Sequence, residues 1–409
     1  MKYKEKKYCR VCGSDNLKMI LDLKDQPLAN SYHKLGEKLE EYPLKLNLCI
    51  KCYHSQLSVV VDPNEMFKHY LYVSGTTDTL KMYFKQFYYT VKANVGIQQG
   101  NVLDIACNDG TQLEIFKAMG WNTYGVDPAE NLYKISSQKG FTKIICNYFN
   151  EDSALELGKK MDVIIAQNVF AHTDDIRDFL KCCRLLSHEN TKIFIQTSQA
   201  DMFVNGEFDT IYHEHLSFFS AKSMLTCANL NGLFLEDIFK TNIHGRSYVF
   251  VLSSRMDDYL NVGAFLAREE KEGRNSLDMY EDFAAKSKSI VNDLKERVKV
   301  YKDKGYLTVG YGAAAKANTL LNFGKINLDF IIDDNPLKQG LFTPGMNIPI
   351  KGSDSLSVDD KMLIVPLAWN FYDEIKSRVE KKRDNPNDVF IKYFPELSIC
   401  HASSQVKFN

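Results

Sequence analysis

Residues 101–120 read NVLDIACNDGTQLEIFKAMG, and this stretch decides the fold of the chain. The run NVLDIA (101–106) predicts a buried strand, and TQLEIFKAMG (111–120) predicts a helix that a glycine ends. A turn of small and polar residues with one glycine, Gly110, joins them. Strand, tight turn and helix in this order indicate the first unit of an α/β fold.

The following residues repeat this alternation. Further strands are predicted at 122–127, 143–147, 162–167 and 191–198, with a helix from about 174 to 186. Continuous apolar strands separated by helical segments indicate a parallel sheet that is covered on both faces. Two more runs, 233–239 and 247–254, predict an antiparallel pair at one edge, and a bridging helix is expected at 79–94.

A second, smaller α/β unit is predicted near the C-terminus. Charged residues of alternating sign at 257–301 favour one long connecting helix. Beyond it, residues 306–323 predict a strand, a glycine turn and a helix, and two more strands follow at 328–336 and 361–370. The fold class is therefore α/β: a small N-terminal module (1–68), a central Rossmann-like domain (69–255) and a smaller Rossmann-like C-terminal domain (256–409).

The composition of the chain limits its expected binding partners and its expected cellular compartment. The chain has 409 residues and a net charge of −1, so no basic field favours nucleic acid or an anionic membrane. It has neither an apolar run of about 18 residues nor the pattern of a signal peptide. We expect a cytoplasmic protein without a membrane or nucleic-acid partner. In a reducing compartment its ten cysteines favour metal ligation over disulfides.

Four of these cysteines form a paired CxxC pattern. Cys9 and Cys12 make the first pair, Cys49 and Cys52 the second, and Gly13 follows the first pair. Two residues between thiolates suit a knuckle that holds tetrahedral Zn²⁺, and four cysteine ligands leave no open position for catalysis. The pattern predicts a structural zinc site; a redox CxxC is the main alternative.

The turn after the first strand predicts a cofactor site. Its single glycine excludes the dinucleotide fingerprint G-x-G-x-x-G. Its acidic and amide residues suit a zwitterionic ligand, and an acid that ends the second strand, Asp127 before Pro128, suits ribose hydroxyls. Together these features favour S-adenosylmethionine (SAM); a Rossmann-like domain for another ligand stays open. The predicted cofactor residues in these strands and turns are Asp104, Ala106, Asn108, Asp109, Gly110, Asp127, Pro128, Asn147, Gln167 and Asn168.

Residues 208–217, FDTIYHEHLS, concentrate reactive side chains after the fifth strand. Such a cluster is typical of an active site. Metal ligation is the main alternative role for its two histidines, His213 and His215, but the metalloprotease spacing H-E-x-x-H is absent. A third histidine, His172, follows the fourth strand in the same predicted crevice, where a buried structural role is an equal alternative.

These motifs resemble those of the sugar C-methyltransferases that act on nucleotide-linked 4-keto-deoxy sugars. The resemblance spans nearly the whole chain. It rests on the four cysteines and on YVSGTTDT (72–79), IACNDG (105–110), GVDPAEN (125–131), QNVFAHTDD (167–175), FDTIYHEHLSFFS (208–220), IHGRSY (243–248), VGYGAAAKANTLLN (309–322) and DDNPLKQGLFTPGMNIPI (333–350). The Tyr-His-Glu-His and C-terminal motifs are the specific ones.

The resemblance implies a three-domain monomer that methylates a carbon, C3, beside the ketone of the sugar. It assigns His215 as the catalytic base, with Tyr212, Glu214 and His172 around the sugar, and Tyr72 as a residue that closes over the site. Two departures stand out: Ala106-Cys107 replace Gly-Ser in the cofactor turn, and Arg246 replaces Gly after His244-Gly245. We expect the first to tighten the space beside the cofactor and the second to alter substrate choice.

The chemistry agrees with this assignment. A carbon beside a ketone becomes nucleophilic when its proton is removed, and a neutral histidine with a reference pKa of about 6.5 is a suitable base. Substrate contacts are predicted at Tyr212, His244 and Arg246. In the C-terminal unit, Lys316 and Asn318 at a helix start suit a pyrophosphate, and Asp333 and Asp334 suit ribose or base.

Three other functions stay open from the sequence. A sugar O-methyltransferase is the nearest alternative. An NAD-dependent sugar-nucleotide oxidoreductase or epimerase and a scaffold without activity are further ones.

Overall fold

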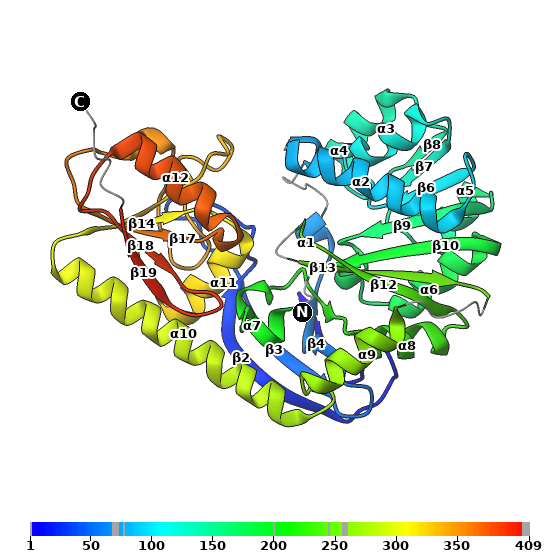
Figure 1. Ribbon diagram of the computed structural model, residues 1–409, viewed down its shortest axis with the longest axis horizontal. Coiled ribbons are helices and arrows are strands. Elements are labelled where there is room, and N and C mark those ends of the chain that lie inside the picture. The colour runs from blue at the N-terminus through cyan, green and yellow to red at the C-terminus, as the bar shows by residue number, and fades with distance from the viewer. Residues whose placement is uncertain are drawn as a thin grey trace. The chain divides into compact units, whose positions relative to one another are not determined.

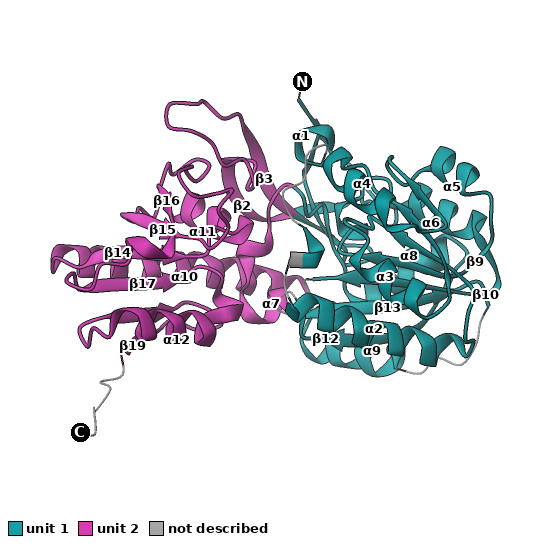
Figure 2. Cartoon of the chain, turned by 90° about the horizontal axis from the view of Figure 1, so that it is seen from above, with its two compact units in different colours: residues 1–18, 47–200, 214–275 teal, residues 19–46, 201–213, 276–409 magenta. Residues whose placement is uncertain are grey.

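The computed structural model describes residues 2–67, 73–76, 78–198, 201–243, 246–255 and 261–402. Two compact units are present (Figure 2). Unit 1 comprises residues 1–18, 47–200 and 214–275, and unit 2 comprises 19–46, 201–213 and 276–409.

Unit 1 is built on a seven-stranded sheet of order β12-β13-β10-β9-β6-β7-β8 (Figure 1). Strands β6 to β10 pair in parallel, as their apolar runs predicted, whereas β13 pairs antiparallel with both β10 and β12. The predicted antiparallel edge pair is therefore confirmed. The strands are β6 (Asn101–Ile105), β7 (Asn122–Val126), β8 (Lys143–Ile145), β9 (Met161–Gln167), β10 (Ser187–Thr197), β12 (Phe234–Thr241) and β13 (Ser247–Ser253).

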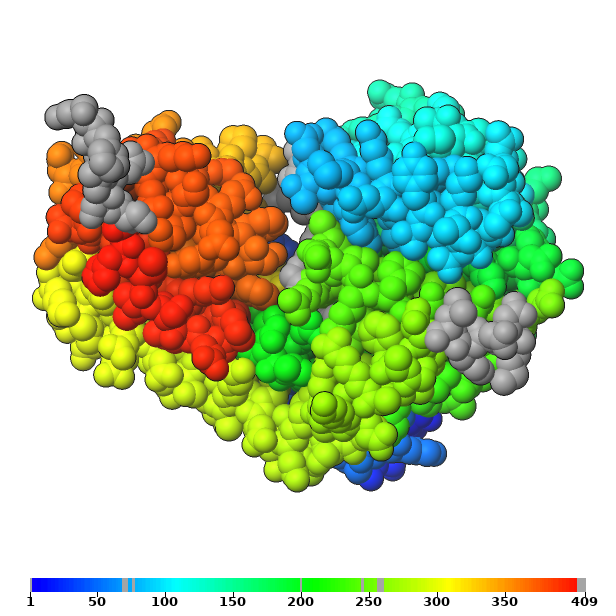
Figure 3. All heavy atoms as spheres, viewed as in Figure 1, coloured from blue at the N-terminus to red at the C-terminus, as the bar shows by residue number. Residues whose placement is uncertain are grey.

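Helices cover both faces of this sheet. On one face α2 (Asp78–Val95) and α3 (Thr111–Ala118) pack against β6 and β9 through residues such as Phe87, Phe116 and Val163. The outer side of α2 forms part of the surface of unit 1 in Figure 3. The other helices of unit 1 are α4 (Glu130–Ser136), α5 (Glu151–Leu157), α6 (Ile176–Leu185), α8 (Ala221–Leu230) and α9 (Val262–Lys271), of which α5, α6 and α8 contribute buried side chains to the opposite core.

The N-terminal strands differ in length and belong to two small sheets. In unit 1, β1 (Tyr3–Glu5) pairs with β5 (Val59–Val61), and β4 (Ser55–Leu57) pairs with β11 (Ser217–Phe218). Strands β2 (Leu17–Pro27) and β3 (Glu41–Cys49) complete a four-stranded sheet of order β11-β4-β3-β2 and have residues in both units. The remaining short elements of unit 1 are α1 (Asn64–Phe67), η1 (Ser74–Thr76), η2 (Ser137–Lys139) and η3 (Phe170–His172).

Unit 2 holds a six-stranded sheet of order β16-β15-β14-β17-β18-β19. All its strands pair in parallel except β19, which pairs antiparallel with β18. The second doubly wound unit is thus confirmed. Its strands are β14 (Leu307–Tyr311), β15 (Phe330–Ile332), β16 (Ile350–Lys351), β17 (Met362–Pro366), β18 (Val389–Lys392) and β19 (Ser398–His401). Its helices are α7 (Met202–Asn205), η4 (Phe208–Thr210), α10 (Leu277–Asp303), α11 (Ala315–Gly324), η6 (Ser353–Ser355), η7 (Trp369–Phe371) and α12 (Tyr372–Arg383).

The expectation of a single connecting helix at 257–301 is wrong. Two helices occupy this stretch, α9 and α10, and the chain breaks between them at Gly273, whose φ of 77° lies in the left-handed region. Ser276 then caps α10, because its side chain accepts a hydrogen bond from the Asp278 N–H. Arg274 is buried between the helices and forms an ion pair with Glu272 at 2.7 Å.

None of the helices in the described ranges has the length and apolar character that crossing a membrane requires.

Candidate functional site

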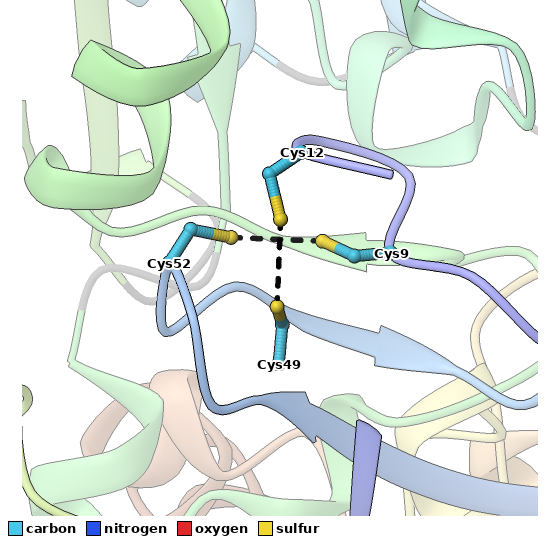
Figure 4. Close-up of side chains that lie close together, drawn as sticks. All are labelled: Cys9, Cys12, Cys49 and Cys52. Atoms are coloured by element: carbon cyan, nitrogen blue, oxygen red, sulfur yellow. Dashed lines mark hydrogen bonds between the residues drawn. The ribbon is translucent and has the colours of Figure 1, made fainter. Parts of the chain in front are cut away.

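The four predicted zinc ligands converge in unit 1 (Figure 4). Their sulfur atoms all lie within 4.8 Å of one another, and the Cys9–Cys52 and Cys12–Cys49 pairs are 3.6 Å apart. A tetrahedral ion with Zn–S bonds of about 2.3 Å requires sulfurs about 3.8 Å apart, so the cluster fits zinc. Four thiolates fill the coordination shell, which makes the site structural.

Each CxxC pair sits in a tight knuckle. The Gly13 N–H donates to the Cys9 carbonyl, and the Tyr53 N–H donates to the Cys49 carbonyl. Gly13 has a φ of 72°, a conformation that a side chain disfavours, and this explains the glycine after the first pair.

Arg10, between the first two cysteines, connects the zinc knuckle to β4 and to the loop before α6. Its side chain is buried; Nη1 donates to the Leu57 carbonyl and Nε donates to Asp174 Oδ1 at 3.0 Å. Burial lowers the pKa of Arg10, and Asp174 opposes this change. No sequence pattern marks this arginine, because its role depends on which loop folds against the knuckle.

The second knuckle lies beside the strand that follows His215. The Leu57 N–H donates to the Leu216 carbonyl, and β4 pairs with β11 through Gln56 and Ser217. His54, which is fully buried, lies with Nε2 3.2 Å from Ser217 Oγ. The zinc module is therefore bonded directly to the segment after the predicted base.

The predicted cofactor turn is organised around Asp127, at the end of β7. Its Oδ2 accepts from the Asn108 N–H at 2.8 Å, and its Oδ1 accepts from the Ala129 N–H at 2.9 Å. Each oxygen keeps a lone pair that can accept a ribose hydroxyl. Pro128 follows in the loop that leads to α4, while Asn147 lies exposed just after β8.

Three carboxylates gather at the ends of β6 and β7. Asp104, Asp109 and Asp127 are each about 5% exposed. Burial, and after it the charges of Asp127 and Asp109, raise the pKa of Asp104 well above its usual value. Buried acids of this kind are stabilised by a cation, and SAM carries an ammonium and a sulfonium. The residues present thus fit this cofactor.

The turn contains residues with left-handed backbone conformations. Ala106 has a φ of 60° and Gly110 a φ of 79°, both in the left-handed region. A side chain at Gly110 would meet the Phe141 ring at 2.5 Å, so glycine is required there. Ala106 accepts the strain that a glycine would avoid. Cys107 packs in the apolar core against Gly125, so its bulk is directed into that core.

A segment before α2 lies on this turn. The Ser74 N–H donates to Asn108 Oδ1 and the Gly75 N–H donates to Asp109 Oδ2. A Cβ on Gly75 would lie 2.4 Å from Asp109 Oδ2, so the contact needs glycine. Tyr72 lies outside the described residues, and its place in the site stays a prediction.

Amide side chains lie at the carboxyl ends of β9 and β10. Gln167 Nε2 lies 3.4 Å from Gln196 Oε1, and the Asn168 N–H donates to the Gln196 carbonyl. The Tyr83 hydroxyl also donates to Gln196. Gln196 and Tyr83 were not predicted, because Gln196 lies inside a strand and Tyr83 on a helix with no motif to mark it.

The two predicted active-site histidines are brought together. The rings of His172 and His215 have centroids 5.0 Å apart, and Phe67 stacks on His172 at 5.8 Å. Burial lowers the pKa of His172 to about 4, so its imidazole is neutral at pH 7. His215 is 4% exposed, and Phe218 packs against its edge.

The Tyr-His-Glu-His motif spans the boundary in the chain between the two units. Tyr212 belongs to unit 2 and is partly exposed, whereas Glu214 and His215 belong to unit 1 and are buried. His213 points into unit 2, where Nε2 donates to the Tyr42 carbonyl at 3.3 Å. His213 therefore has a packing role.

The other predicted substrate residues differ in their settings. His244 lies outside the described residues. Arg246 is exposed and has a φ of 90°, a conformation that glycine adopts without strain. In unit 2, Lys316 is partly exposed, with Nζ 4.9 Å from the centre of the Trp369 ring. Asn318 is 1% exposed and its Nδ2 donates to the Ala29 carbonyl, so the structure gives it a packing contact.

The two aspartates after β15 serve the loop around them. Asp333 accepts from the Ala313 and Asn335 N–H groups. Asp334 forms an ion pair with Arg378 and accepts from the Tyr311 hydroxyl.

The seven-stranded sheet, the acidic cofactor turn and the cysteine cluster together define a SAM-dependent methyltransferase with a structural zinc site. Three family models match the chain: "Putative zinc binding domain" over residues 9–67, "Methyltransferase domain" over 82–237 and "C-methyltransferase C-terminal domain" over 242–395. Together these three matches run from residue 9 to residue 395, so the chain is similar to C-methyltransferases along most of its length.

Individual relatives agree with this placement. The C-methyltransferase NovU of Streptomyces niveus is 29% identical over 414 residues, which cover 97% of each chain. The human mitochondrial ubiquinone biosynthesis O-methyltransferase is 27% identical over 105 residues, 24% of this chain and 28% of the relative.

Solved structures with partial similarity include two methyltransferases. The magnesium protoporphyrin IX methyltransferase of Synechocystis with bound SAM has 14% identity and a TM-score of 0.32, covering 42% of this chain and 79% of its own. A SAM-dependent methyltransferase of Clostridium acetobutylicum has 14% identity and a TM-score of 0.35, covering 44% and 92%.

Proposed function

We propose that this methyltransferase transfers the methyl group of SAM to a carbon, C3, beside the ketone of a nucleotide-linked 4-keto-deoxy sugar. The observation that supports this best is the adjacent pair of histidines, His172 and His215, in the same unit as the cofactor turn. Carbon methylation needs a base that removes a weakly acidic proton, and such a base must be neutral before it acts.

In this proposal His215 takes the proton from the carbon and becomes an imidazolium. The electron pair of the broken C–H bond forms an enolate, whose oxygen accepts a hydrogen bond from His172 or Tyr212. Neutral His172 is suited to donate one, because burial holds its pKa at about 4. Bound SAM supplies the activated methyl group, and no metal is needed for that step.

Glu214 and the zinc module orient the base. Glu214 is buried immediately before His215, and β11 immediately after it is paired with β4 of the zinc module. Support on both sides limits the freedom of the imidazole, which favours a fixed geometry for proton transfer.

Incubation with SAM and a panel of nucleotide-linked keto-deoxy sugars tests the function. We expect a product heavier by one methylene unit, in which NMR shows the new methyl on carbon. A methyl on oxygen would identify a sugar O-methyltransferase. Turnover with NAD in place of SAM would identify an oxidoreductase or epimerase.

Lys316 is proposed to hold the pyrophosphate of the sugar nucleotide. It lies in the first turn of α11, where backbone N–H groups and the helix dipole also favour an anion. We expect Lys316→Ala to raise the KM for the sugar nucleotide at least tenfold, the loss of about one charged hydrogen bond, with an unchanged KM for SAM. Lys299→Ala, at an exposed position of α10, is the control.

A further inference from the structure

Asp209 is a buried acid that the proposed mechanism does not use. It lies in η4, three residues before Tyr212, and its side chain is completely buried. Oδ2 accepts a hydrogen bond from Trp369 Nε1 at 2.8 Å. Among the described residues, Oδ1 has no hydrogen-bond partner. A buried carboxylate with one unsatisfied oxygen is costly, so its retention calls for a reason.

Trp369 links this acid to the candidate anion site. The indole N–H donates to Asp209, while the face of the same ring lies 4.9 Å from Lys316 Nζ. Three segments of unit 2, η4, α11 and η7, thus contribute one acid, one ring and one cation to a single cluster.

The surrounding contacts fix this cluster. Thr319 Oγ1, on α11, donates to the Ile211 carbonyl at 3.1 Å. The Phe208 ring packs against Phe323 at 5.7 Å and against Phe394 at 5.9 Å. A change in the charge of Asp209 therefore acts on Lys316 through the Trp369 ring, and on Tyr212 through the segment that both residues share.

We propose that Asp209 is a positioning residue of the Lys316 anion site and that binding of a pyrophosphate there is coupled to protonation of Asp209. This inference rests on the proposed sugar-nucleotide function. With the site empty, the Asp209 charge attracts the Lys316 ammonium across the Trp369 ring. A bound dianion repels the Asp209 charge, so Asp209 takes up a proton from solvent as the anion binds.

The electrostatic setting agrees with this coupling. Burial raises the pKa of Asp209 to about 7, while Lys316 and the Trp369 hydrogen bond act in the opposite direction. The charged group on its own segment is Glu207, and the titratable group after β18 is Tyr393, whose pKa burial raises well above its usual value. Within this surrounding, Asp209 is the acid that changes charge near neutral pH.

This coupling makes the affinity for the anion depend on pH. The protonated form of Asp209 binds the anion more tightly, so affinity falls as pH rises through about 7. A shift of one pKa unit on binding makes this fall about tenfold.

Calorimetric titration with UDP-glucose and dTDP-glucose tests the inference, because their pyrophosphate diesters keep the same charge from about pH 6 to about pH 8.5. The full-length wild-type chain should lose about tenfold in affinity over this range, and Asp209→Asn should remove the dependence. Trp369→Phe, which keeps the ring but loses the hydrogen bond, should move the dependence to higher pH.

Asp354→Asn is the matched control, since this acid lies in the same unit but is exposed and paired with Lys382. It should keep the wild-type pH dependence. A flat wild-type profile, or an unchanged slope in Asp209→Asn, would overturn the coupling and leave the proposed function intact. Failure of both sugar nucleotides to bind at any pH would contradict the proposed function and the coupling together.

Discussion

Asp127 shows how a single side chain organises the cofactor turn. Its two oxygens accept backbone N–H groups from the turn after β6 and from the loop after its own strand. Burial raises its pKa, and these two hydrogen bonds oppose the rise. One acid thus joins the two loops between which the cofactor is expected.

We predict that Asp127→Ala weakens SAM binding and leaves the fold intact. The loss should be at least tenfold, since one hydrogen bond to a charged group contributes about 1.5–3 kcal/mol. Calorimetry measures the affinity, and circular dichroism checks the fold. Asp152→Ala, at an exposed position on α5, should bind SAM as the wild type does. Equal affinity in Asp127→Ala would place the ribose elsewhere.

Site residues marked by position in the chain were predictable. Asp127 and the cofactor turn follow strands directly, and parallel strands bring their carboxyl ends to one edge of a sheet. Arg10, Gln196 and Asp209 were not predictable, because each depends on a contact between segments far apart in sequence. Backbone strain at Ala106 and Arg246 was equally hidden until the dihedral angles were known.

At the level of elements, the zinc module and the histidine loops form one connected support. Arg10 reaches Asp174, two residues after His172, and β4 pairs with β11, which begins two residues after His215. Both histidines are therefore held by segments adjacent to the cysteine knuckles.

Arg10 should matter for catalysis without binding either substrate. Arg10→Lys keeps a charge but cannot reproduce bonds from two guanidinium nitrogens, so we expect kcat to fall several-fold with an unchanged affinity for SAM. The NMR signals of His172 should shift in this variant. Lys4→Ala, on exposed β1, is the control. Unshifted His172 signals would show that Arg10 does not position its loop.

Zinc should contribute folding energy and no chemistry. Cys12→Ala removes one of four ligands, and apparent binding energies of structural zinc reach about 10–16 kcal/mol. We expect this variant to aggregate or to melt at a much lower temperature, whereas Cys146→Ala, which is exposed and outside the cluster, behaves as the wild type. Elemental analysis should find one zinc per chain; less than half an equivalent in folded protein would contradict the site.

For the whole molecule, hydrophobic patterning predicted most of the architecture. Both parallel sheets and the antiparallel edge pair follow from apolar runs of strand length. The break between α9 and α10 was missed, because alternating charges continue across it and Gly273 was the only local sign. That β2 and β3 have residues in both units was also not predicted. The units are defined by contacts in space, and each unit comprises stretches that are far apart in the sequence.

Stability should fall in acid because of buried histidines. Burial lowers the pKa of His213 to about 4, against about 6.5 when unfolded, so the unfolded chain binds the extra proton first. The resulting loss begins as pH falls below about 6.5 and is complete below about 4, with a slope of about 1.4 kcal/mol per pH unit. Urea unfolding at several pH values measures it.

His213→Gln should reduce that slope, since glutamine can still donate to the Tyr42 carbonyl but does not titrate. His188→Gln is the control, because His188 is partly exposed beside Asp162. A slope that His213→Gln leaves unchanged would assign the acid sensitivity to other groups.

The central claim is that His215 removes a proton from the carbon that receives the methyl group. Its most direct test is deuterium exchange at that carbon in D₂O, with the nucleotide-linked keto sugar and without SAM. The wild type should exchange one proton, and His215→Asn should bind the sugar nucleotide but exchange none. Exchange that persists in His215→Asn and disappears in His172→Asn would assign the base to His172. No exchange by the wild type would contradict the enolate mechanism.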